Sequence, residues 1–312
     1  QDTHIWPSRI EEWSKRPDAV LMNSGQAVSD FVRRFSVAIL GDHEEGTRAP
    51  WSGTGVLVQL GKSQFVLTAG HCVKDAGTAP VIVPLSHDPR IIRFDFPNRG
   101  FIYEDGFDFG FFEVPHFDRQ RFETSKVFVG ADRLQVDTAA NLLSDDHFVI
   151  SGFPRLLSQE PEDGVEMFQH HTVATSCAGH RNTPSSKVPV PTGLQVLDLA
   201  YDETAPRSDM MKESVTIPDH LTALGGASGG ACWKGCVVPS PETWSTDKMK
   251  LVGVHVGRAR AAREADDTQY LFAREVLIGH HLALIARNCP KVAGSIYERW
   301  PALQDWPLAP ER

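Results

Sequence analysis

The chain has 312 residues, of which 41% are hydrophobic and 23% charged, and its formal net charge is −9. This length allows one large domain or two small ones, and the acidic balance argues against a nucleic-acid partner, because phosphate binding needs clustered Lys and Arg. No apolar run reaches the roughly 18 residues of a membrane helix, so no membrane partner is expected.

The first 30 residues are mixed in character and are interpreted as an N-terminal extension (1–30), with a short helix around Ser8–Trp13. This end shows no signal peptide, and it lacks an initiator methionine, so either the chain was trimmed or a leader was removed. Five cysteines are an odd number and too few for a disulfide-stapled scaffold. We therefore favour a cytoplasmic location over secretion.

From Phe31 onward, short apolar runs are separated by Gly, Pro, Asp and Asn. Strand-length runs at short intervals, without helices alternating between them, predict an all-β sandwich or barrel. The runs expected to form strands are Phe35–Leu40, Gly55–Leu60, Phe65–Thr68, Val81–Val83, Phe109–Val114, Phe148–Ser151, Val196–Leu199 and Leu251–Val256.

A C-terminal helix is expected over 270–289, where apolar residues recur at three- and four-residue spacing, and Pro290 is expected to end it. The tail 291–312 contains several prolines and is expected to be irregular. Two polar stretches rich in Gly and Pro, Pro154–Pro191 and Thr204–Pro218, are interpreted as long surface loops.

Three short segments carry residues suited to nucleophilic catalysis. His71 ends the apolar run in Thr-Ala-Gly-His-Cys, Asp108 opens another apolar run, and Ser228 lies in Gly-Gly-Ala-Ser-Gly-Gly. A serine hydroxyl needs a base to take its proton as it attacks, and a carboxylate that accepts the imidazole Nδ1–H holds that base in one tautomer. Asp105 is an alternative carboxylate, but Asp108 directly precedes the apolar run and fits better.

The glycines around Ser228 suit an oxyanion hole, because glycine tolerates the backbone angles that turn N–H groups inward. We expect the N–H groups of Gly226 and Ser228 to be its donors.

The three motifs, in this order, resemble the chymotrypsin-like (trypsin-fold) serine peptidases over roughly Phe31–Asn288; α/β-hydrolases and subtilisins place their triads in other orders. The resemblance implies an all-β fold of two antiparallel six-stranded β-barrels with a C-terminal helix. In a peptidase domain over 31–290, the first barrel (31–135) would carry His71 and Asp108, and the second (140–270) would carry Ser228. It also implies a serine endopeptidase that acts on a polypeptide substrate without a cofactor.

Two departures from that family bear on control. Ala227 stands where digestive members carry the Asp that pairs with a new N-terminus, so activation by that ion pair is not expected. Regulation would then use the long loops, the extension or a protein partner. Cys72 lacks its usual disulfide partner, because the preceding strand, Trp51–Gly55, holds no cysteine. We expect Cys72 to be a buried thiol outside any disulfide.

Three residues bear on which P1 residue the substrate would carry. Thr222 stands where trypsin-like enzymes carry an Asp, which argues against a basic P1 residue. His255 and Gly257 lie in a segment, Leu251–Gly257, that resembles the strand lining the S1 pocket. A His at this point resembles glutamyl endopeptidases, which implies a P1 Glu or Gln preference; the alternative is that His255 only packs inside the barrel.

A structural zinc held by Cys177, His180, Cys232 and Cys236 is conceivable, but the spacing is not a standard zinc signature. We expect these cysteines to be buried thiols or to form one local disulfide, and we expect no metal. The adjacent pairs His170–His171 and His280–His281 form no chelate alone and are interpreted as non-functional.

Two other functions compete with an active endopeptidase. The chain could be a latent or partner-activated peptidase homologue that acts mainly as a protein-binding module. An HtrA-like quality-control peptidase would append a PDZ domain, and the tail after Asn288 is too short to form one.

Overall fold

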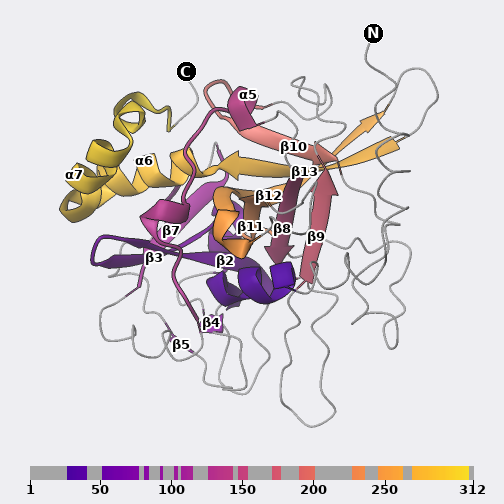
Figure 1. Cartoon of the computed structure of the whole chain (residues 1–312), viewed down its shortest axis with the longest axis horizontal. Coiled ribbons are helices and arrows are strands. Elements are labelled where there is room, and N and C mark those ends of the chain that lie inside the picture. The colour runs from indigo at the N-terminus through magenta and orange to yellow at the C-terminus, as the bar shows by residue number, and fades with distance from the viewer. Residues whose placement is uncertain are drawn as a thin grey trace.

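The computed structural model describes residues 27–40, 51–76, 81–83, 92–93, 102–104, 107–114, 126–142, 147–153, 171–176, 190–200, 227–235, 245–262 and 269–308. These residues form two antiparallel sheets with some helices, so the fold is mostly β, as the sequence predicts. Figure 1 places helices α6 (Ile278–Asn288) and α7 (Pro290–Arg299) together at one end of the molecule.

The first sheet has seven strands in the order β5-β4-β1-β2-β3-β7-β6, and every neighbouring pair is antiparallel. Its centre is apolar, and all seven residues of β3 are buried. The strands are β1 (Ser36–Leu40), β2 (Trp51–Leu60), β3 (Ser63–Ala69), β4 (Val81–Val83), β5 (Ile92–Arg93), β6 (Ile102–Glu104) and β7 (Phe109–Glu113).

The second sheet has six strands in the order β10-β13-β12-β11-β8-β9, again antiparallel throughout. The long pair of β13 and β12 lies between β10 and β11, and β11 carries the chain away from the Ser228 turn. The strands are β8 (His147–Gly152), β9 (His171–Ser176), β10 (Val196–Ala200), β11 (Ala231–Lys234), β12 (Lys250–Ala262) and β13 (Gln269–Leu277).

One large apolar cluster connects both sheets and the C-terminal helix. It contains Phe65 of the first sheet, Trp233 of the second and Leu282 of α6, all fully buried. A helical segment at residues 27–32 and the short helix η1 (Arg33–Phe35) add Phe31 and Phe35, whose rings lie 5.5 and 5.2 Å from the Trp233 ring. Val28 belongs to the same cluster and is buried, so the packed region includes part of the predicted extension.

Each of the eight apolar runs expected to be a strand coincides with a strand of these sheets, except that Phe35 belongs to η1 and Val114 follows the end of β7. Within the described residues, the outer strands of each sheet are not hydrogen-bonded to each other. Two antiparallel sheets are thus established, whereas closure into two barrels stays a prediction.

The C-terminal helix begins at Ile278, not near residue 270 as predicted. Residues 269–277 form β13 instead, because they pair with β10 on one side and β12 on the other, and this pairing overrides the helical spacing of the side chains. Helix α6 ends at Asn288, just before Pro290, as predicted. A further helix, α7, was not predicted, and Pro290 occupies its first turn, where proline lacks only an N–H that would be unbonded anyway.

The predicted irregular tail also forms helix. Helix α7 and the short helix η9 (Pro301–Asp305) pack Val292, Ile296 and Leu303 against α6 and the core. Another correction concerns the predicted loop over 154–191, which contains β9, a run of the sequence His-Thr-Val-Ala-Thr-Ser that pairs with β8. Residues 154–170 and 177–189 of that loop, the 204–218 loop and the predicted helix at Ser8–Trp13 lie outside the described residues.

The short helices that complete the described chain are α3 (Gly70–Ala76), η4 (Ala131–Arg133), α5 (Ala139–Leu142) and η8 (Thr246–Lys248). Among the described helices, none combines the length and apolar character needed to cross a membrane.

Candidate active site

His71 and Asp108 are brought together by the pairing of β3 with β7. Ala69, the last residue of β3, lies opposite Phe109, the first residue of β7, so the residues just beyond this pair, His71 and Asp108, meet at the end of the strands. Gly70 is needed at this junction, because a Cβ there would lie 3.1 Å from the Asp108 carbonyl carbon.

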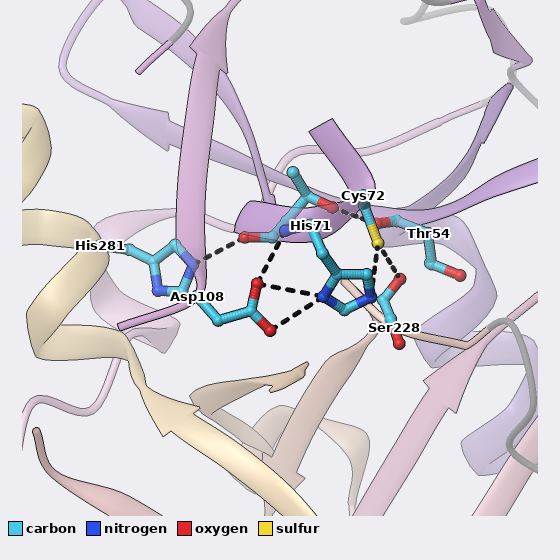
Figure 2. A network of polar contacts seen from close by, with 7 residues as sticks. Thr54, His71, Cys72, Asp108, Ser228 and His281 are labelled. Carbon is cyan, nitrogen blue, oxygen red and sulfur yellow. Dashed lines mark hydrogen bonds and ion pairs between the residues drawn. The ribbon is translucent and has the colours of Figure 1, made fainter. Parts of the chain in front are cut away.

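Asp108 holds the backbone and the side chain of His71 at once. Its Oδ1 accepts the His71 backbone N–H at 2.7 Å, and its two carboxylate oxygens lie 3.0 and 2.8 Å from His71 Nδ1. Asp108 has a positive φ of 53°, a left-handed conformation that Asp tolerates better than most residues. A carboxylate held in this way fixes Nδ1 as the donor, which leaves Nε2 on the other side of the ring for a reacting group (Figure 2).

The charge state of His71 follows from its neighbours. Its hydrogen bond to the Asp108 carboxylate, followed by its contact with Cys72, raises the pKa of His71 to about 10, although burial acts in the opposite direction. The side chain is 39% exposed, so solvent screens part of this effect. In the arrangement described, His71 is stabilised as the imidazolium.

The turn that carries Ser228 is held by backbone hydrogen bonds from both sheets. Thr54 of β2 donates its N–H to the Ser228 carbonyl oxygen at 2.7 Å, and Gly229 donates to the carbonyl oxygen of His255 at 2.6 Å. Gly229 has a φ of 86°, and a Cβ there would overlap the Thr54 carbonyl oxygen. Glycine is therefore required directly after Ser228.

His71 and Ser228 are neighbours, and Cys72 connects them. Cys72 Sγ lies 3.6 Å from His71 Nε2 and 3.3 Å from the Ser228 carbonyl oxygen. Figure 2 draws no bond between the Ser228 hydroxyl and Nε2 among these described residues. Cys72 is buried and outside any disulfide, as predicted.

The predicted substrate-binding residues are placed only in part. His255 and Gly257 lie on β12 beside the Ser228 turn, and His255 is buried against Glu275 at 2.8 Å. Among the described residues, no atom lies within 4 Å of a Cβ added to Gly257. Gly226, Thr222 and the alternative carboxylate Asp105 lie outside the described residues.

The zinc hypothesis is untested for the same reason: Cys177, His180 and Cys236 lie outside the described residues. Cys232 is buried and in no disulfide. In the part of the chain that the structure describes, no group of His, Cys, Asp and Glu is arranged to hold a metal ion.

Sequence reasoning missed two buried residues near this site. His281 of α6 donates from Nε2 to the Thr68 carbonyl oxygen at 3.1 Å and so supports the strand that leads to His71 (Figure 2). Glu275 was overlooked as part of an expected helix. Its sequence neighbour Arg274 offers a local partner of opposite charge, so the sequence holds no signal that Glu275 is buried against His255.

Comparison with known proteins adds little. No protein-family model matches the sequence, and no curated protein sequence matches it significantly. Among solved structures, it is similar to a chain from a study of the coupled folding and binding of the intrinsically disordered Sesbania mosaic virus VPg protein. That match has a TM-score of 0.35 and 14% identity, and covers 78% of this chain and 86% of the other. A similarity this weak supports no inference about family or function.

Proposed function

We propose that this chain is a chymotrypsin-like serine endopeptidase that hydrolyses polypeptides through an acyl-enzyme. The observation that carries the proposal is the contact of His71 Nδ1 with both oxygens of Asp108, at 3.0 and 2.8 Å, beside the turn that carries Ser228. The sequence order of the three motifs supports the same assignment.

In this mechanism the Ser228 hydroxyl attacks the scissile carbonyl carbon while His71 Nε2 takes its proton. The same proton then goes to the leaving amine, and Asp108 stabilises the imidazolium formed in between. Nε2 must exchange its contact with Cys72 for the Ser228 hydroxyl and must be unprotonated before attack. Both requirements make the resting arrangement a less reactive form.

The oxyanion would be bound by backbone N–H groups of the Ser228 turn. The N–H groups of Gly229 and Gly230 are already used by the carbonyl oxygens of His255 and Ala227, at 2.6 and 2.8 Å. We therefore assign the Ser228 N–H as one donor and the Gly226 N–H as the second. Each such donor is worth about 10²–10³ in rate.

Peptide hydrolysis by purified variants tests the proposal. We expect Asp108→Asn to lower kcat by about 10⁴, because the His71 tautomer is no longer fixed, and Ser228→Ala to lower it further. Ser245→Ala, which removes only the hydroxyl that caps η8, serves as the control and should retain activity. Full activity of Ser228→Ala would contradict the proposal.

We also propose that His255 contributes to a P1 Glu or Gln preference, with Thr222 and Gly257 as further S1 residues. The position of His255 on the strand bonded to Gly229 and Gly230 supports this proposal. A P1-scanning peptide library tests it: His255→Ala should lose the Glu or Gln preference. A preference of the wild type for basic or bulky apolar P1 residues would discard it.

A latent or partner-activated homologue is the second candidate. It is favoured by the contact of His71 Nε2 with Cys72 at 3.6 Å, where an active enzyme would bond the Ser228 hydroxyl. Hydrolysis of peptides by the chain alone would exclude this candidate, whereas hydrolysis that requires an added protein would support it.

A further inference from the structure

His255 and Glu275 form a buried pair across two strands of the second sheet. They face each other in the register of β12 and β13, where directly opposed side chains lie close enough to interact. His255 Nδ1 lies 2.8 Å from Glu275 Oε1, and the two side chains are 1% and 0% exposed. The second carboxylate oxygen, Oε2, is buried without a hydrogen-bond partner.

This pair lies directly beside the Ser228 turn. The His255 carbonyl oxygen accepts the Gly229 N–H at 2.6 Å, and its N–H donates to the Gly230 carbonyl oxygen at 2.8 Å. Because Nδ1 faces Glu275, Nε2 on the opposite side of the ring is the remaining polar atom of the His255 side chain.

The number of protons in the pair decides what Nε2 can bind. With one proton the pair would carry a net charge of −1, which burial strongly disfavours. With two protons it is neutral overall: one proton lies between Nδ1 and Oε1, and the other is on Nε2. A second proton on Oε2 instead would be a buried donor without an acceptor, which is also unfavourable.

The surrounding charges are consistent with this proton count. Asp198, which acts electrostatically on Glu275, is paired with Arg274 through two hydrogen bonds of 2.8 and 2.9 Å. Burial, with a smaller contribution from Asp198, raises the pKa of Glu275, while His255 opposes that shift. Because the pKa of Glu275 is raised, the pair takes up its second proton more readily, and this favours the neutral pair.

We propose that Glu275 is a specificity-determining positioning residue: it holds His255 so that Nε2–H is always a donor, and this donor binds the side-chain oxygen of a P1 Glu or Gln. The inference rests on the proposed peptidase function and on His255 as an S1 residue. The Nε2–H donor selects substrates that carry an acceptor oxygen in the P1 side chain, and the amide NH2 of a P1 Gln has no role in this selection.

Glu275→Gln tests this role in the full chain. The amide oxygen of Gln still accepts Nδ1–H, but the pair loses a proton, so Nε2 becomes an acceptor. Gln at P1 can then donate its NH2 to Nε2, whereas the carboxylate of Glu meets a lone pair. We expect the ratio of kcat/KM for P1 Glu over P1 Gln to fall by roughly 10- to 100-fold, mainly through KM.

A second measurement needs no variant. Wild-type protein is given a peptide whose P1 residue is the methyl-ketone isostere of glutamine, which keeps the acceptor oxygen and lacks the NH2 donor. We expect its kcat/KM to lie within a few-fold of that of the P1 Gln peptide. A loss of more than about 10-fold, the worth of one hydrogen bond, would overturn the inference even if Glu275→Gln did not fold.

The control is Ser245→Ala, which removes a hydroxyl bonded to Asp247 at η8 and should leave the Glu/Gln ratio unchanged. Labelling of Ser228 by a fluorophosphonate is measured for every variant, because it reports the catalytic chemistry without using S1. If wild type is not labelled, the proposed function fails. If Glu275→Gln is labelled at the wild-type rate with an unchanged Glu/Gln ratio, the inference alone is overturned.

Discussion

Thr54 donates its backbone N–H to the carbonyl oxygen of Ser228 at 2.7 Å, and this bond joins the first sheet to the turn that leads into the second. The Thr54 hydroxyl also accepts the N–H of Phe153 at 2.9 Å, and its carbonyl oxygen accepts the Thr68 hydroxyl at 2.7 Å. One residue is thus bonded to the Ser228 turn, to the end of β8 and to the strand before His71. This arrangement keeps base and nucleophile in one relative position.

Gly229→Ala should disrupt that arrangement. Its φ of 86° alone costs a non-glycine residue about 1–3 kcal/mol, and the new Cβ would also displace the Thr54 carbonyl oxygen. We expect a lower free energy of unfolding in urea and loss of fluorophosphonate labelling.

Gly61→Ala is the control for backbone strain. Gly61 has a φ of 59° in the turn between β2 and β3, but an added Cβ meets nothing within 4 Å. It should cost only about 1 kcal/mol and leave labelling intact. If both variants label equally well, close packing of Gly229 against Thr54 does not position the nucleophile.

Cys72→Ala should shift the pH dependence of hydrolysis. Cys72 contributes to the raised pKa of His71, so its removal lowers that pKa towards the ordinary value of 6.5. The unprotonated base then appears at lower pH, and the acidic limb of the kcat/KM profile moves to lower pH. Cys232→Ala, another buried cysteine outside any disulfide, should leave the limb in place. An unchanged limb in Cys72→Ala would show that the thiol does not influence the base.

His280 and His281 should make the fold sensitive to acid. Burial lowers the pKa of His280 to about 3 and that of His281 to about 4, so both stay neutral in the folded state while the unfolded chain takes up protons below 6.5. Their contribution to stability is therefore present above pH 6.5 and is lost as the pH falls towards 4. Each histidine contributes about 1.4 kcal/mol per pH unit in that window.

The raised pKa of His71 acts in the opposite sense: its contribution is full below pH 6.5 and is lost as the pH rises towards 10. The test therefore compares the pH dependence of the unfolding free energy between wild type and a His280 variant. His280→Gln can still accept from Gln195 and donate to Pro307, as His280 does at 2.8 and 2.9 Å. The change in unfolding free energy between pH 7.5 and 5.5 should shift by about 1.4 kcal/mol relative to wild type. An identical pH dependence in both proteins would contradict the assignment.

Local signals in the sequence were sufficient for most strands and for the meeting of His71 with Asp108. Both residues flank strands whose apolar runs are clear, and antiparallel pairing then brings their ends together. The segment 269–277 could not be assigned in the same way. Its Leu, Ala, Arg and Glu favour helix locally, and only its pairing with two other strands makes it β.

Buried polar partners were also beyond sequence reasoning. His281 and Thr68 are 213 positions apart, and His255 and Glu275 meet only because two strands pair in one register. The spacing of residues along the chain carries no information about such contacts. The resting contact of His71 with Cys72, in place of the Ser228 hydroxyl, belongs to the same class, because it depends on side-chain positions.

The central claim is that Ser228, activated by His71, is a nucleophile. It is tested most directly by mass spectrometry of the chain after treatment with a fluorophosphonate probe. We predict one adduct, mapped to Ser228, that is absent from Ser228→Ala and forms far more slowly in His71→Ala. Unchanged labelling of Ser228→Ala, or an adduct mapped to another serine, would contradict the assignment.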